Sequence, residues 1–209
     1  MTSPPALAPA RAHALAGTGP LFRLALGRDR LRFLGWIGAI VLLVASSYLA
    51  YDTVFPDPAT TAELTASFSS NTAFTLLLGK VHDLSTPGAF TTWRSLGLSS
   101  VAVSLMAIFT VVRHTRAEED SGRAELVASA AVGRHAPLTA ATLLAAAACL
   151  ATTVAVTVAL VAASLPDGGP DLAGALALGA AIGATGLVFT RATAVAATGR
   201  ASTAHRSAT

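Results

Sequence analysis

The side chains that could bind ions or take part in catalysis are concentrated in one charged run, Arg113 to Leu126, between two long uncharged segments. Within it, His114 and Glu118 are four residues apart, so on a helix they would share a face and could ligate a metal ion together. A stable metal site needs about four ligands, and no second pair of histidine and carboxylate lies nearby. We therefore expect no metal site in this run.

A second motif, Gly79-Lys80, resembles the end of a phosphate-binding loop. That loop also requires glycine five residues earlier and serine or threonine immediately after the lysine, where this chain has Phe74 and Val81. The apolar segments also do not place a serine, a histidine and an aspartate at the same depth in the membrane, as a catalytic triad would require. The sequence predicts no catalytic residue, no cofactor bound by this chain and no enzymatic activity.

The elements around the charged run have the composition of a membrane protein. Hydrophobic residues make up 53% of the chain and charged residues 12%, about half the usual charged share. A helix crosses the hydrocarbon core of a bilayer with about 20 apolar residues. Four segments meet this requirement without an ionisable residue other than tyrosine, and they predict an all-α integral membrane protein with about four transmembrane helices, at 33–51, 95–112, 138–165 and 172–190.

Arginine residues are distributed unequally between the two ends of these predicted helices. Twelve of the 14 basic residues lie in the first 32 residues, the loop 113–137 or the tail 191–209. Cytoplasmic loops carry an excess of Lys and Arg. The sequence therefore predicts a multi-pass protein of the plasma membrane with both termini and the loop 113–137 cytoplasmic, surrounded by the lipid bilayer.

The segments outside the spans have distinct compositions. Residues 1–20 are rich in Pro and Ala and are expected to be disordered. Residues 21–33 mix leucine and phenylalanine with arginines, which favours a short interfacial helix before the first span or, alternatively, an ordinary basic flank. The outer loop 52–94 is expected to be helical from Ala59 to Leu78 and to pack against the spans through Phe68, Phe74 and Leu76 to Leu78.

Two further patterns concern helix ends and helix contacts. Thr115 and Glu118 have the spacing of a capping box, and with Gly133 as a stop they predict a compact helix within the cytoplasmic loop. In the fourth span, Gly179 and Gly183 form a small-xxx-small step that would let another helix approach closely. Glycines simply tolerated in an Ala-rich membrane helix are the alternative.

The charged run also has a simple structural interpretation. Arg116 with Asp120, and Glu119 with Arg123, fall at i,i+4, so the run could be a solvated helix that pairs its own charges.

The order of residues favours a docking surface instead. The string Glu118 to Leu126, followed by Val132-Gly133-Arg134, resembles the cytoplasmic signature of type-2 ABC transporter permeases. The longer string from Arg113, with Arg23-Leu24-Ala25-Leu26 near the start and Gly186 to Thr190 in the fourth span, is similar to permeases of the polyketide-antibiotic (tetronasin-resistance) exporters. The resemblance covers roughly residues 19 to 190.

This resemblance implies partners and contact residues. A separate ABC ATPase subunit would bind and hydrolyse ATP, and its contacts would be Glu118, Glu119, Gly122, Glu125 and Leu126. Such permeases continue into a second helical half, so the chain resembles the N-terminal half, and the missing half or another permease copy would complete it. No nucleic acid is expected as a partner.

The sequence therefore predicts the permease subunit, or a truncated form of it, of an ATP-driven exporter for an amphipathic compound such as a polyketide antibiotic. A small non-transport membrane scaffold or regulator, docking a cytoplasmic partner through the loop 113–137, is the alternative.

Overall fold

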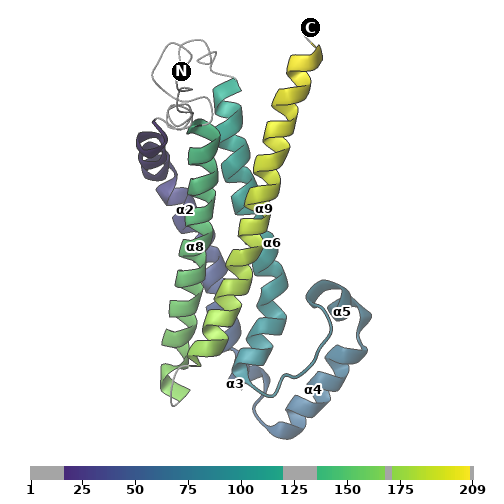
Figure 1. The fold of residues 1–209 in the computed structure, drawn as a ribbon. Coiled ribbons are helices and arrows are strands. Elements are labelled where there is room, and N and C mark those ends of the chain that lie inside the picture. Colours follow the sequence, from purple (N-terminus) through teal and green to yellow (C-terminus); the bar gives the residue numbers. More distant parts are fainter. Residues whose placement is uncertain (1–16, 120–135, 168–170, 208–209) are drawn as a thin grey trace, which may run out of the picture.

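A computed structural model describes residues 17–119, 136–167 and 171–207. Within these ranges, four helices are long and apolar enough to cross a membrane, and they form an elongated bundle (Figure 1). The predicted all-α integral membrane fold is confirmed. These helices are α2 (Thr18–Leu49), α6 (Pro87–Glu119), α8 (Ala136–Ser164) and α9 (Leu172–Ser207).

The centre of the bundle is the pair α6 and α8, and both α2 and α9 pack against this pair. The interior is filled by aliphatic side chains and many alanines, which lets the helix backbones lie close together. The fully buried side chains include Ile40, Val44, Val103, Met106, Leu144, Val156 and Ile182. Packing of this kind, rather than a hydrophobic effect, holds helices together within lipid.

The contact between α8 and α9 depends on glycine. A Cβ added at Gly179 would lie 2.8 Å from the carbonyl oxygen of Thr153, and one at Gly183 would collide with the hydroxyl of Thr153. In addition, the Thr157 hydroxyl donates to the carbonyl oxygen of Ala175 at 3.3 Å across the same contact. The close helix approach predicted from the small-xxx-small step is confirmed.

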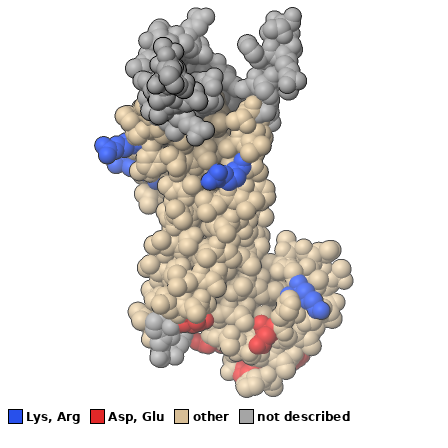
Figure 2. Space-filling model, in the orientation of Figure 1, with Lys and Arg blue, Asp and Glu red and all other residues tan. Residues whose placement is uncertain are grey.

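Charge divides the bundle into two ends separated by an uncharged belt (Figure 2). We call the end with the first turns of α2 and the later turns of α6 and α9 the arginine-rich end; it includes Arg23, Arg28, Arg30, Arg32, Arg113 and Arg191. We call the opposite end the acidic end; its charged residues include Asp52, Asp57, Glu63, Asp83 and Asp171, with Lys80 and Arg94. The first residue of α2 and the last of α9 both lie at the arginine-rich end (Figure 1).

The segment between α2 and α6 is folded at the acidic end. It contains α3 (Tyr51–Val54), α4 (Pro58–Ser70) and α5 (Thr72–Leu78), and η1 (Leu165–Asp167) follows α8 at the same end. Asp57 caps the start of helix α4, because its carboxylate accepts from the Thr60 amide at 2.9 Å, and the side-chain oxygen of Asn71 caps α5 in the same way. The helix expected from Ala59 to Leu78 is therefore broken in two at Asn71.

An aromatic cluster joins this segment to α6. Phe68 stacks on Trp93 with ring centroids 5.4 Å apart, and Phe74 lies 6.2 Å from the same ring. The predicted packing through Phe68 and Phe74 is confirmed. Leu76 and Leu77, however, are 83% and 67% exposed, because the short helix α5 turns only one face toward α6.

Three helices are longer than the sequence indicated. Helix α6 extends beyond the predicted span 95–112 at both ends, so the last residues of the predicted outer loop 52–94 belong to it. Residues 21–33, expected to form a separate interfacial helix, belong to the continuous helix α2, because Gly27 alone lowers helix stability without ending a helix. Likewise, α9 continues from the predicted span through Arg191 to Ser207. The tail 191–209 contains no proline and is rich in Ala and Arg, which favour helix.

Candidate functional site

The candidate site lies at the arginine-rich end, where α2 meets α6. Its centre is Asp29, which is only 3% exposed although it lies in a run of arginines. Arg113 donates from Nη1 to one carboxylate oxygen of Asp29 at 2.8 Å, and His114 Nε2 lies 2.7 Å from the other oxygen. Arg32 is 3.9 Å away on the same helix as Asp29. Both oxygens of Asp29 are thus engaged from a different helix.

These contacts stabilise the Asp29 carboxylate, whose burial would otherwise cost free energy. A buried carboxylate without partners loses its hydration, so it is found paired or hydrogen-bonded. Charge-assisted hydrogen bonds of this length are about twice as strong as neutral ones. Because Arg113 and His114 are adjacent on α6, the last turns of α6 are fixed to α2 at two points. We call these three residues the Asp29 clamp.

The position of the clamp relative to the lipid is indicated by its neighbours. Trp36 and Phe109 lie one to two turns further into the bundle, with ring centroids 6.5 Å apart. With Arg32, Val112 and Arg113 they line a recess of about 390 Å³. Tryptophan is enriched at the membrane–water interface, where its ring is partly apolar and partly polar. The clamp therefore lies at the level where the uncharged belt ends.

The partner of His114 is Asp29, which was not among the residues considered for metal binding. Because Nε2 faces a carboxylate oxygen, the protonated nitrogen is assigned to Nε2, which donates to Asp29. Across the residues that the structure describes, no group of three or more His, Cys, Asp or Glu side chains is arranged to hold a metal ion.

The predicted contact residues follow directly after the clamp. Glu118 and Glu119 belong to the final residues of α6. Gly122, Glu125 and Leu126 lie outside the described residues. The order along the chain is therefore clamp, end of α6, then the rest of the charged run.

The predicted capping box at Thr115 is wrong. Thr115 lies inside α6, and its hydroxyl donates to the carbonyl oxygens of Val111 and Val112 at 3.1 and 3.0 Å. Such back-bonding is a common alternative for a threonine within a helix. The predicted loop 113–137 thus begins as a direct continuation of α6 through Glu119.

Sequence reasoning missed Asp29, because the basic flank was assigned outside the bundle. One signal was present: Asp29 is the sole acidic residue in the first 51 residues, and it is surrounded by Arg28, Arg30 and Arg32. An isolated acid among arginines next to a membrane span is a candidate for pairing with another helix.

Comparison with known proteins gives one informative similarity. No protein-family model matches the chain. The chain is 40% identical over 191 residues to a multidrug efflux system permease protein of Mycobacterium tuberculosis. This alignment covers 91% of the chain and 34% of that protein. The chain thus spans about one third of the length of the curated relative that it matches.

Proposed function

We propose that this chain is a membrane-embedded permease component of an ATP-driven efflux system for amphipathic compounds. The observation that carries the proposal is the 40% identity over 191 residues to a protein named as a multidrug efflux permease. Because the alignment extends over 91% of this chain, it includes the apolar helices as well as the charged run. The apolar bundle is the framework that such a component requires.

A separate ABC ATPase subunit supplies the energy in this proposal. The ATPase binds and hydrolyses ATP, and it contacts the charged run through Glu118, Glu119, Gly122, Glu125 and Leu126. The carboxylates make charge-assisted contacts with basic groups of the ATPase, and Leu126 provides an apolar anchor. The support is the resemblance of this run to the cytoplasmic signature of type-2 ABC permeases.

The Asp29 clamp gives this contact a mechanical path into the bundle. A displacement of the charged run moves the last turns of α6, which contain Arg113 and His114. Because both side chains bind the Asp29 carboxylate, α2 must follow α6 or the clamp must break. The ATPase thereby acts on two helices through one docking segment.

The exported compound is proposed to be amphipathic, with polyketide antibiotics as an example. A second permease unit, either a further half or another copy of this chain, completes the pathway. The support for a second unit is the length of the curated relative, of which this chain matches about one third.

Co-purification and transport test this function together. We expect the tagged chain, solubilised from its own membranes, to retain an ATPase containing a phosphate-binding loop, and inverted vesicles to accumulate an amphipathic drug only with ATP. Glu119→Lys with Glu125→Lys should abolish both results, because the reversed charges repel basic groups of the partner. Glu63→Lys, a charge reversal in α4 at the acidic end, should change neither.

Two results would overturn the proposal. Accumulation that proceeds equally without ATP would exclude an ATP-driven exporter. If the Glu119→Lys, Glu125→Lys variant co-purified with the ATPase as well as the original chain, the charged run would instead be interpreted as a solvated helix that pairs its own charges.

A further inference from the structure

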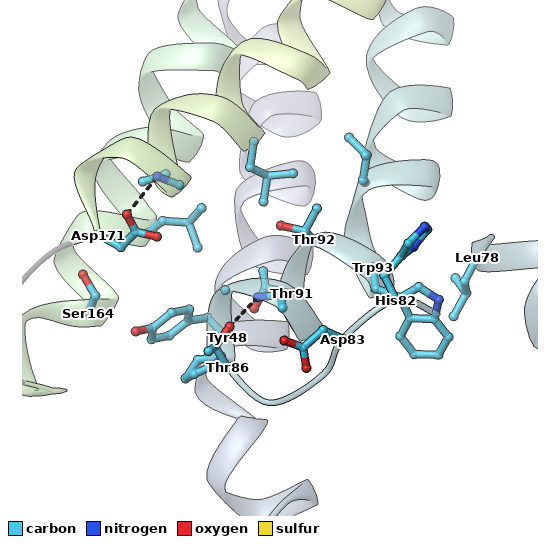
Figure 3. A pocket seen from close by; sticks show the side chains of 18 of the residues that line it. Tyr48, Leu78, His82, Asp83, Thr86, Thr91, Thr92, Trp93, Ser164 and Asp171 are labelled. Carbon is cyan, nitrogen blue, oxygen red and sulfur yellow. Dashed lines mark hydrogen bonds between the residues drawn. The ribbon is translucent and has the colours of Figure 1, made fainter. Parts of the chain in front are cut away.

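A large cavity opens at the acidic end of the bundle, at the opposite end from the Asp29 clamp. It has a volume of about 890 Å³, which is within the range of about 300–1,000 Å³ for sites that bind drug-sized molecules. Its walls come from the ends of α2, α6, α8 and α9 and from the segment 78–86 (Figure 3). We call it the acidic-end cavity.

One wall of the cavity is apolar and rigid. It includes Leu96, Leu160 and Leu178 from three different helices, together with Trp93. The Trp93 indole N–H donates to the carbonyl oxygen of Gly79 at 3.0 Å, and the ring stacks on Phe68. Because both contacts fix the ring, this wall is already formed before any molecule enters.

Two carboxylates border the cavity from different walls, Asp171 at the start of α9 and Asp83 before α6 (Figure 3). Asp83 accepts from the amide and hydroxyl of Ser85 at 2.8 and 2.9 Å. These hydrogen bonds hold the pKa of Asp83 below its usual value, so the group is charged at neutral pH. Asp171 accepts from the Gly174 amide at 2.9 Å. A carboxylate offers about four acceptor positions, so both retain capacity for a ligand.

The cavity also borders a polar group that lacks a partner. Thr91 is completely buried behind the wall. Its hydroxyl and that of Ser99 are the two buried side-chain polar atoms without a hydrogen-bond partner among the described residues. Unsatisfied buried polar groups are uncommon in folded proteins and call for an explanation, and a bound molecule that accepts or donates at the Thr91 hydroxyl would supply one here.

The surrounding charge favours a cation. By sequence, the acidic end has six acidic residues, the five listed above and Asp167 of η1, against the two basic residues Lys80 and Arg94, a formal net charge of −4 for these residues. Lys80 also borders the cavity but makes no ion pair with any residue in the described ranges. A cleft with low-dielectric walls concentrates the field of such charges and attracts ions of the opposite sign.

We propose that the acidic-end cavity binds amphipathic organic cations, with the apolar body against Trp93 and the leucines and the positive charge between Asp83 and Asp171. This inference rests on the proposed function, because the bound cation would be the compound that the efflux system exports. It narrows that function from amphipathic compounds in general to compounds carrying a positive charge.

The test uses two ions of matched shape and opposite charge, tetraphenylphosphonium and tetraphenylborate. The chain has two tryptophans, so the Trp36→Phe variant leaves Trp93 as the single fluorescent reporter, placed in the cavity wall. We expect saturable binding of tetraphenylphosphonium to the purified protein in lipid nanodiscs, accompanied by a change in Trp93 emission. Tetraphenylborate should bind at least about tenfold more weakly, because two nearby carboxylates repel it.

Charge removal tests the two carboxylates. Asp83→Asn with Asp171→Asn should weaken tetraphenylphosphonium binding about tenfold. Asparagine retains the side-chain carbonyl that accepts from the Ser85 and Gly174 amides, so both turns are preserved. Asp57→Asn is the matched control, since it removes one charge from the same end without touching the cavity, and binding should change less than about twofold.

Three results would overturn the proposal: equal binding of the two ions, an unchanged affinity in the double variant, or binding without a response from Trp93. The comparison of the two ions needs no variant in the carboxylates, so it decides the matter even if the double variant does not fold. Failure of ATP-dependent transport with intact cation binding would instead contradict the proposed function and leave the cavity as a binding site.

Discussion

Asp29 and Arg113 are 84 residues apart in the chain, yet a 2.8 Å hydrogen bond joins their side chains. Asp29 is almost completely buried, whereas the Arg113 side chain is 36% exposed. The buried Asp29 carboxylate therefore has Arg113 and His114 as its partners in place of water, whereas the Arg113 side chain can still be hydrated. In a protein whose helices otherwise contact through aliphatic and small side chains, this pair fixes the relative position of α2 and α6.

Removing the carboxylate should destabilise the bundle. We expect Asp29→Ala to lower the free energy of unfolding by about 2 kcal/mol, below the about 3–5 kcal/mol of a fully buried pair, because Arg113 can still reach water. Arg30→Gln, which removes a charge from an exposed neighbour, should have little effect. Unfolding in SDS, followed by circular dichroism, measures both. Strictly additive effects of Asp29→Ala and Arg113→Ala would contradict a direct interaction between them.

The glycines of α9 should differ in their tolerance of a methyl group. Gly179→Ala places a Cβ 2.8 Å from a backbone oxygen of α8, so the helices must separate, and we expect a loss of about 1–3 kcal/mol. At Gly186→Ala the nearest atoms to the new Cβ are side-chain atoms of Cys149 and Val103 rather than backbone, so this variant should be milder. Gly35→Ala, on an open face of α2 with nothing within 4 Å, should be neutral. Thermal unfolding in detergent ranks the three variants, and equal losses would exclude the close contact.

The charge distribution predicts the orientation in the membrane. In a Cys149→Ala background, which lacks other cysteines, a membrane-impermeant maleimide should label Glu63→Cys in intact cells. It should label Asp120→Cys only after the membrane is permeabilised, since the arginine-rich end is expected to be cytoplasmic. Labelling of Asp120→Cys in intact cells would reverse the orientation.

The carboxyl group of Asp57, which caps the start of α4, should titrate at a lower pH than an ordinary aspartate. The amide and hydroxyl of Thr60 donate to Asp57 and hold the pKa of this carboxyl below its usual value. Because the folded-state pKa is lowered, the cap stabilises α4 above the unfolded-state pKa of about 3.9. This contribution is lost as the pH falls through the lower folded-state pKa.

A carboxyl-carbon NMR titration measures the midpoint for Asp57. We expect Thr60→Ala to raise it toward the usual value, since one donor is lost. Thr61→Ala is the matched control, because the Thr61 hydroxyl donates to the backbone oxygen of Asp57 and leaves its carboxylate alone. A midpoint unaffected by Thr60→Ala would show that the hydroxyl is not the donor.

The membrane-spanning helices could be predicted because their signal is local. Each is a long uncharged apolar segment, and the cost of placing charge in lipid makes such segments easy to recognise. The glycine contact was predictable for the same reason, since Gly179 and Gly183 repeat at the spacing of one helix face.

The Asp29 clamp and the acidic-end cavity could not be predicted in this way. Each depends on residues that are distant in sequence, such as Asp29 with His114 or Asp83 with Asp171, and a single sequence does not show which helix faces meet. The spacing of Thr115 and Glu118 was misleading, because a threonine that begins a helix and one that bonds back within a helix have similar neighbours.

Helix α9 extends without interruption beyond its apolar part, from Thr190 to Ser207. At about 1.5 Å per residue, these 17 steps form a rod about 26 Å long. Any tilt of the buried part is therefore magnified at its far end, and a rotation of about 10° would move Ser207 sideways by about 4–5 Å. Small rearrangements among the packed alanines and glycines would thus produce larger displacements at the far end of α9, outside the lipid.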